Sequence, residues 1–348
     1  MANQAAAPAG ASGTRIVVQQ RSGCATRVIL FVALVVSVWF NVAQYQRLDR
    51  AGLAGKELEV GERTHSGDED AEQKVAVISV TGTILDGDGF AKQQIDRVRE
   101  DDQVKAVVLR IDSPGGTVTG SDYLYHHLRE LVAERELPMV VSMGSVAASG
   151  GYYVAMAAGD AEDVIYAEPT SWIGSIGVII PHFDLTGLLE SWHIEDDSIR
   201  SHPLKQLGSP TRPMSEEERE ILSGLVEHSY ERFKDVVRTG RPELAADEEL
   251  FAEVTTGEVF STARAIELKL VDREGFLDDA IARAIELAGL DADEVRTVTY
   301  ESFGGLFSPL FASQRSPTWS LADAIDLSTP RAYYLFTRFP DVRSARSP

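Results

Sequence analysis

Two glycine-rich turns hold the residues of this 348-residue chain that are best suited to chemistry. The first is Asp112-Ser113-Pro114-Gly115-Gly116, which follows the apolar run 106–111. The second spans residues 144–153 (GSVAASGGYY) and follows the apolar run 139–143. Sites in α/β proteins form where the carboxyl ends of strands meet such turns. We therefore expect the two turns to share one site.

Ser149 is the candidate nucleophile of the second turn. Small residues surround it on both sides, and a helix is predicted to begin at or directly after it. A hydroxyl at a helix start lies among free backbone N–H groups, which suits a nucleophile beside an oxyanion hole. The Gly115-Gly116 turn would supply a second N–H group. The alternative is that the small residues only permit close packing and Ser149 caps the helix.

A serine nucleophile needs a base. Lys205 is the only lysine between residues 106 and 233, and it lies in a segment rich in turn formers. Desolvation can lower a lysine pKa enough for base catalysis, whereas an arginine stays protonated. The alternative is an ordinary exposed loop lysine. Among the seven histidines, His182, His193 and His202 lie in predicted loops and stay open as bases, and no HExxH or P-loop motif is present.

Strands alternate with helices through the first half of the predicted domain, which indicates a parallel α/β fold. The second half is more helical, and Ser215 with Glu218 forms a capping-box pattern at the start of one helix. The predicted strands are 75–80, 106–111, 139–143, 164–166 and 176–180, and the predicted helices are 91–100, 121–136, 150–158, 215–238, 261–270 and 277–287.

Composition excludes several classes of protein. The net charge is −21, so a nucleic-acid partner is not expected. A single cysteine, Cys24, excludes an intramolecular disulfide and a cysteine-rich zinc site. The sequence predicts no cofactor and no metal.

The amino-terminal region predicts a membrane anchor. Residues 28–40 contain no charged side chain, and Arg15, Arg21 and Arg27 precede them. The positive-inside rule then places the amino terminus in the cytoplasm and the rest of the chain outside. We expect a cytoplasmic tail at 1–27, a transmembrane helix at 28–44 and a stalk at 45–72, within which 47–60 could be helical. A cleaved signal peptide and a buried helix are the alternatives.

The motifs together resemble the signal peptide peptidase A family, which are membrane-bound serine peptidases with a Ser/Lys dyad. The resemblance extends over residues 74–305. Its most specific part is the AASGGYY block with the lysine-containing loop downstream. The matching segments are 75–84, 106–116, 141–155, 173–178, 201–214 and 257–281.

This resemblance implies a role for each matching residue. Ser149 corresponds to the nucleophile and Lys205 to the general base, while Ser175 corresponds to the serine that orients the lysine amine. The backbone N–H groups of Gly116 and Gly150 would form the oxyanion hole. The implied fold is the Clp protease/crotonase-like spiral of ββα units, at 73–299, followed by a carboxyl-terminal extension at 300–348. Members assemble into rings in which neighbouring subunits can share a dyad.

The predicted function is that of a membrane-anchored serine endopeptidase that degrades remnant signal peptides. Such apolar, extended peptides would bind beside an exposed strand, for which 176–180 is the candidate. One alternative is a related peptidase that cleaves a specific membrane-protein partner. A crotonase-like acyl-CoA enzyme and an inactive membrane scaffold are further alternatives.

Overall fold

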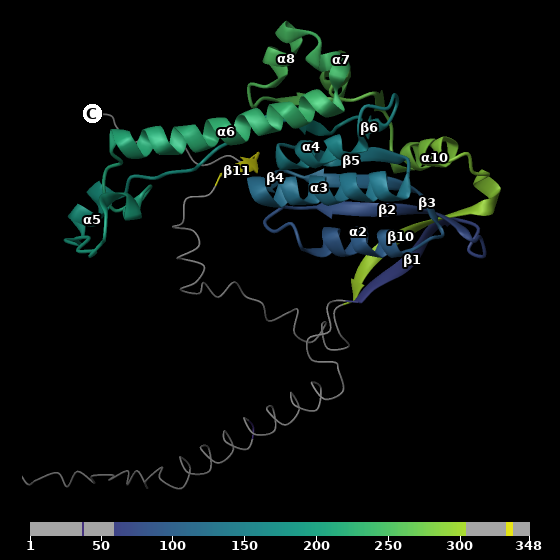
Figure 1. Cartoon of the computed structure of the whole chain (residues 1–348), viewed down its shortest axis with the longest axis horizontal. Coiled ribbons are helices and arrows are strands. Elements are labelled where there is room, and N and C mark those ends of the chain that lie inside the picture. Colours follow the sequence, from purple (N-terminus) through teal and green to yellow (C-terminus); the bar gives the residue numbers. More distant parts are fainter. Residues whose placement is uncertain (1–36, 38–58, 304–331, 337–348) are drawn as a thin grey trace, which may run out of the picture. The chain divides into compact units, whose positions relative to one another are not determined.

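A computed structural model describes Ser37, residues 59–303 and residues 332–336 (Figure 1). The chain divides into two units, residues 1–57 and residues 58–348. The predicted tail and all of the predicted anchor except Ser37 lie outside the described residues. Among the described residues, no helix combines the length and the apolar character that a membrane span requires.

A large, mostly parallel sheet forms the centre of the second unit and confirms the predicted α/β class. Its central strands are almost continuously buried, which is typical of parallel strands covered on both faces. Neighbouring strands from β2 to β9 run parallel, in the order β2-β3-β5-β6-β9. These strands are β2 (Gln73–Thr81), β3 (Val104–Ser113), β5 (Met139–Ala148), β6 (Ile165–Ala167) and β9 (Arg273–Glu274).

Two long strands extend the sheet beyond β2. β10 (Val295–Phe303) runs parallel to β2, and β1 (Glu59–Gly67) pairs antiparallel with β10 at the edge. The sheet therefore starts within the segment 45–72 that the sequence suggested as a stalk, and it continues past residue 299. Polar residues dominate β1, so its sequence lacks the apolar run that marks a central strand.

Helices α2 (Phe90–Glu100), α3 (Val118–Arg135) and α4 (Gly150–Ala155) lie side by side along the sheet (Figure 1). The helical spacing of apolar residues explains their packing, because Leu124, Leu128 and Leu131 all lie on the buried face of α3. A 3-10 turn, Met156–Ala158, completes the predicted helix 150–158 after α4.

Short strands assemble at the carboxyl end of β5. β7 (Trp172–Gly174) runs parallel to the end of β5 and antiparallel to β8 (Val259–Ser261). The prediction of a strand at 176–180 is wrong, because only Ile179 makes a single bridge there. A separate two-stranded sheet joins β4 (Gly115–Thr117) to β11 (Tyr333–Leu335).

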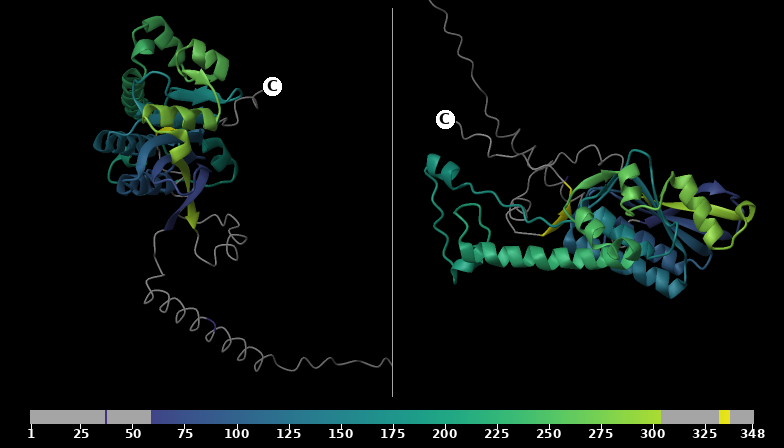
Figure 2. Two further views of the ribbon diagram at one scale, coloured as in Figure 1. Left: turned by 90° about the vertical axis from the view of Figure 1, so that its right-hand side faces the viewer. Right: turned by 90° about the horizontal axis from the view of Figure 1, so that it is seen from above.

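Helix α6 (Glu216–Gly240) dominates the second half of the unit, and Ser215 and Glu218 form the predicted capping box at its start. Two views show α6 extending past the sheet, with α5 (Thr186–Ser191) at its far end (Figures 1 and 2). The predicted helix 261–270 is shorter than expected, while the predicted helix 277–287 is confirmed. The remaining helices are α7 (Pro242–Ala245), α8 (Glu248–Val254), α9 (Thr262–Glu267) and α10 (Leu277–Leu287).

Candidate active site

Ser149 lies at the sharp turn between β5 and α4. Its φ is +52° and its ψ is −114°, a conformation that costs free energy for any residue with a Cβ. Its N–H group donates to the Gly174 carbonyl at 2.7 Å, and its carbonyl accepts from Tyr153 N–H at 2.9 Å. These bonds hold the strained residue between a strand and a helix, where such turns present a nucleophile. Only 1% of Ser149 is exposed.

Gly116 and Gly150, the predicted oxyanion-hole residues, lie against one another. A Cβ atom at Gly150 would come within 3.1 Å of the Gly116 nitrogen and 2.4 Å of Ser121 Oγ. A Cβ atom at Gly150 would therefore displace the Ser121 hydroxyl, because real Cβ contacts are essentially never shorter than 3.0 Å, and it would crowd the Gly116 nitrogen. The structure thus brings the two glycine-rich turns together beside Ser149, as the sequence predicted.

Asp112 and Ser113 hold the two turns in place. An Asp112 carboxylate oxygen accepts from the N–H group of Val146 at 3.2 Å, which joins the first turn to the second. Ser113 Oγ donates to the Gly82 carbonyl at 2.6 Å and accepts from Gly115 N–H at 3.1 Å. Both residues belong to the DSPGG motif, but the sequence alone assigned them no role.

Ser175 lies next to Ser149 through the pairing of their strands. Ala148 pairs with Gly174, so the residues that follow each of them leave the sheet side by side. Ser175 is 8% exposed and has a φ of +52°. Its N–H group donates to the Glu258 carbonyl at 2.6 Å. The structure therefore gives both serines strained, buried backbones at adjacent strand ends.

Lys205 lies apart from the serines of its own chain. It belongs to the exposed 3-10 turn η2 (Pro203–Gln206), in the arm that connects β7 to α6. Arg212 joins η2 to the start of α6, because Nη2 donates to the Gln206 carbonyl at 3.0 Å and Nη1 to Glu218 at 2.8 Å. Within the described residues, the Lys205 amine has no hydrogen-bond or ion-pair partner. The described hydrogen bonds and ion pairs of one chain therefore do not join Lys205 to Ser149 or Ser175.

Comparison with known proteins identifies the family. The sequence profile of peptidase family S49 matches residues 132–291, which include Ser149, Ser175 and Lys205. One relative is a protein of Synechocystis that is named, by inference, as a protease. It is 38% identical to this chain over 229 residues, and the match covers 66% of this chain and 79% of that protein. The chain belongs to peptidase family S49. It is accordingly a serine peptidase, and the resemblance to the signal peptide peptidase A family is confirmed.

Longer S49 relatives share only part of their length with this chain. Protease 4 of Salmonella typhi is 35% identical, and the match covers 62% of this chain and 35% of that protein. The serine protease SPPA of Arabidopsis thaliana, named as chloroplastic, is 36% identical over 59% of this chain and 29% of its own length. The chain thus spans about a third of these two relatives.

The histidines of this S49 peptidase lie elsewhere in the fold. His126 and His127 lie on α3 beside Glu130, with ligand atoms within 4.8 Å of one another. Both imidazoles contact the Glu130 carboxylate, and His126 is mostly exposed. His202 caps η2 by accepting from Leu204 N–H at 3.2 Å. No histidine among the described residues hydrogen-bonds to Ser149.

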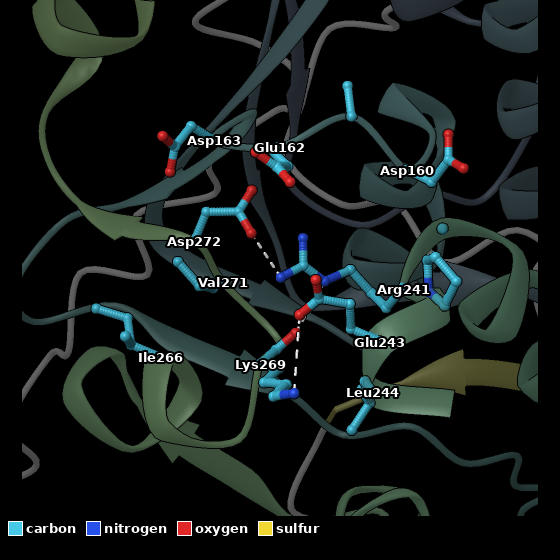
Figure 3. A pocket seen from close by; sticks show the side chains of 13 residues that line it. Asp160, Glu162, Asp163, Arg241, Glu243, Leu244, Ile266, Lys269, Val271 and Asp272 are labelled. Carbon is cyan, nitrogen blue, oxygen red and sulfur yellow. Dashed lines mark hydrogen bonds and ion pairs between the residues drawn. The ribbon is translucent and has the colours of Figure 1, made fainter. Parts of the chain in front are cut away.

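A polar pocket lies between α7, the loop 160–163 and the segment 266–272, and it contains none of the predicted site residues (Figure 3). Most of its charged groups already have partners within the fold. Arg241 donates to Asp272 at 2.6 Å and to the Lys269 carbonyl at 2.8 Å, while Asp272 also accepts from the N–H groups of Val164 and Ile165. This hydrogen-bond network stabilises the fold of the S49 domain, so we assign the pocket no catalytic role.

Proposed function

We propose that this S49 peptidase is a membrane-anchored endopeptidase that degrades remnant signal peptides or other apolar peptides released in the membrane. One observation carries the proposal. Ser149 lies in a strained turn at the end of β5, with Gly116 and Gly150 directly beside it. The names of two relatives, a serine protease SPPA and an inferred signal peptide peptidase of Enterococcus faecium, support the substrate class.

In the proposed mechanism, Ser149 Oγ attacks a peptide carbonyl carbon while neutral Lys205 accepts the hydroxyl proton. The N–H groups of Gly116 and Gly150 stabilise the negative oxygen of the tetrahedral intermediate. The lysine then returns its proton to the leaving amine, which leaves an ester between Ser149 and the peptide. Water attacks this ester and gives its proton to Lys205, which passes it to Ser149 Oγ as the ester bond breaks and a free carboxyl end is released. Ser175 orients the lysine amine.

Lys205 has to come from a neighbouring copy of the chain, since its own arm lies away from Ser149. No residue from 177 to 217 is buried, although the arm carries large apolar side chains such as Trp192, which is 65% exposed. A chain segment without a fully buried residue gains little to offset the loss of entropy on ordering. A homo-oligomeric ring would cover the arm and desolvate Lys205, which base catalysis requires.

The finer fold assignment and the location belong to the same proposal. The parallel run β2-β3-β5 with its covering helices is what a Clp protease/crotonase-like spiral would have. Residues 28–44 would anchor the chain, with the amino terminus in the cytoplasm and the peptidase domain outside. The arginines before residue 28 and the absence of charge from 28 to 40 support this orientation.

Labelling and digestion of the full chain in detergent test the proposal. A fluorophosphonate is expected to label Ser149, and synthetic signal peptides are expected to be cleaved. Ser149→Ala should abolish both without changing the circular dichroism spectrum. Labelling at another serine, or hydrolysis that survives in Ser149→Ala, would overturn the assignment. Cleavage of one membrane protein but of no isolated signal peptide would favour the alternative of a related peptidase that cleaves a specific membrane-protein partner.

A further inference from the structure

Two neighbouring histidines and a glutamate of α3 gather around one carboxylate. His126 Nε2 lies 3.1 Å from one oxygen of Glu130, and His127 Nδ1 lies 3.0 Å from the other. Glu130 follows the two histidines by four and three residues, which are the spacings that bring side chains together on a helix surface. Among the described residues, this is the one group of three or more histidine, cysteine or acidic side chains whose ligand atoms all lie within 4.8 Å of one another.

The distances within this group are close to those around a bound metal ion. Zinc binds imidazole nitrogens and carboxylate oxygens at about 2.0–2.2 Å, so a tetrahedral arrangement separates two ligand atoms by about 3.3–3.6 Å. The two contacts of Glu130 are within about 0.6 Å of that separation. The two imidazole nitrogens are at most 4.8 Å apart, so they need to approach by no more than about 1.5 Å.

His127 is held in place, whereas His126 can adjust. The ring of Tyr123, one turn earlier on α3, packs edge-on against His127 with ring centroids 4.4 Å apart. The side chain of His127 is 18% exposed, and that of His126 is 61% exposed. A rotation of the exposed imidazole can therefore close the group around an ion without a change in the backbone. The same exposure leaves room for a water molecule as the fourth ligand.

The charges around Glu130 favour a cation. Arg99 of α2 lies 3.8 Å from a Glu130 oxygen, but it also contacts Asp96 at 3.3 Å and Glu134 at 3.1 Å. Lys92 pairs with Asp96 as well. Three carboxylates thus face two basic groups, which leaves a negative charge beside the imidazoles. Arg99 would remain as a partner of the carboxylate, since metal-ligating carboxylates are usually hydrogen-bonded in turn.

We propose that His126, His127 and Glu130 bind a divalent transition metal ion such as Zn²⁺ through two nitrogens, one carboxylate and a water molecule. Imidazole ligands select zinc, nickel and copper over magnesium and calcium, which prefer oxygen ligands. The expectation of no metal rested on the lack of cysteine-rich and HExxH patterns, and this spacing is neither of them. The proposed hydrolysis uses none of these side chains, so the metal site is independent of Ser149.

A metal bound at this site would stabilise α3. All three ligands belong to that helix, so the site exists only where α3 is folded, and an ion that binds only the folded chain raises its stability. α3 begins directly after the Gly116 turn and packs against α2 and α4 (Figure 1). A rise in the unfolding temperature should therefore accompany metal binding.

Zinc titration of the full chain in detergent tests the site. Every chain carries Cys24→Ser and no histidine tag, so that neither the single thiol nor a tag can hold the metal. Calorimetry should detect one saturable Zn²⁺ per chain, and Mg²⁺ at the same concentration should not bind. Zn²⁺ should also raise the unfolding temperature. His126→Ala and His127→Ala should each weaken binding by about 100-fold or more, because loss of an outer partner alone costs about 10–100-fold.

Matched variants separate ligation from general effects of charge. Glu130→Gln removes a ligand and should weaken binding strongly, whereas Glu134→Gln removes the same charge beside Arg99 and should not. His228→Ala removes an exposed histidine of α6 and should also leave binding unchanged. Because His126 is exposed, its replacement decides the question even if His127→Ala fails to fold. Binding that survives the loss of either histidine, equal losses in the two glutamate variants, or no saturable binding would overturn the proposal.

Discussion

At the scale of single residues, the site depends on glycines more than on charged groups. Gly150 shows why, since its missing Cβ lets its turn contact the Gly116 turn. The two N–H groups would act on one oxygen only if that spacing is kept, because oxyanion donors work at about 2.7–3.1 Å. Changes at these glycines should therefore affect hydrolysis before they affect the fold.

Gly150→Ala is expected to lower kcat/KM by about 10–100-fold, since small displacements at a reacting centre carry costs of that size. Overpacking should also destabilise the fold by about 1–3 kcal/mol. Peptide hydrolysis and urea unfolding measure the two effects. Gly224→Ala is the matched control, since a Cβ there meets nothing within 4 Å.

The double variant Ser121→Ala/Gly150→Ala separates the two effects. It removes the 2.4 Å contact with Ser121 Oγ but keeps the close approach to Gly116. Stability should recover while hydrolysis stays low. Recovery of both would mean that the Gly116–Gly150 spacing plays no part in catalysis.

At the scale of elements, the start of α6 carries an acid-sensitive contact. Glu218 accepts from Arg212 at 2.8 Å and from Ser215 N–H at 2.9 Å. The Arg212 hydrogen bond lowers the pKa of this buried carboxyl from 4.5 to about 2. A lowered folded-state pKa contributes stability above pH 4.5, and this stability is lost as the pH falls toward 2.

Glu218→Gln should therefore lower the free energy of unfolding at pH 7 by about 1.5–3 kcal/mol, the range for hydrogen bonds to charged groups. It should also remove part of the loss of stability that the unaltered chain shows between pH 4.5 and 2. Denaturant unfolding as a function of pH measures both quantities. Glu217→Gln removes the same charge from an exposed neighbour, and equal behaviour of the two variants would contradict the prediction.

Sequence patterns predicted the elements that bury continuous apolar runs. β2, β3 and β5 follow from such runs, and α6 follows from its capping box. The edge strand β1 escaped prediction because it is polar and pairs with β10, more than 200 residues away. No local signal marks such a pairing, since β propensity depends on the neighbours that a strand finds.

The site could be predicted in part for the same physical reason. Ser149, Gly116 and Gly150 belong to turns that directly follow predicted strands, so their proximity follows from the sheet. Tyr334 has no comparable signal, because it lies in an aromatic-rich segment of ambiguous pattern and reaches the site only through pairing with β4. Lys205 belongs to the arm that connects β7 to α6, and no residue of this arm from 177 to 217 is fully buried in the single chain. Sequence patterns therefore do not predict where the lysine lies.

At the scale of the whole molecule, that arm is the part of the chain that the proposed ring would cover. No residue from 177 to 217 is fully buried, and Lys205 lies among them without a partner in the described part of the chain. A head-to-tail interface repeated around a closed ring would give every Ser149 the Lys205 of one neighbour. Activity should then depend on assembly, and inactive chains should be able to complete one another.

Mixing two inactive variants tests this directly. Ser149→Ala keeps Lys205, and Lys205→Ala keeps Ser149, so each alone should be inactive. In rings formed at random from equal amounts of both, a working site needs one chain of each kind in the right order, which gives about a quarter of the unaltered activity. The chains must be mixed unfolded or coexpressed so that subunits exchange, and a double variant mixed with the unaltered chain controls for dilution. If the mixture stays inactive although mixed rings are recovered through a tag on one variant, each chain pairs its own serine and lysine. The arm would then have to fold back onto Ser149 of the same chain.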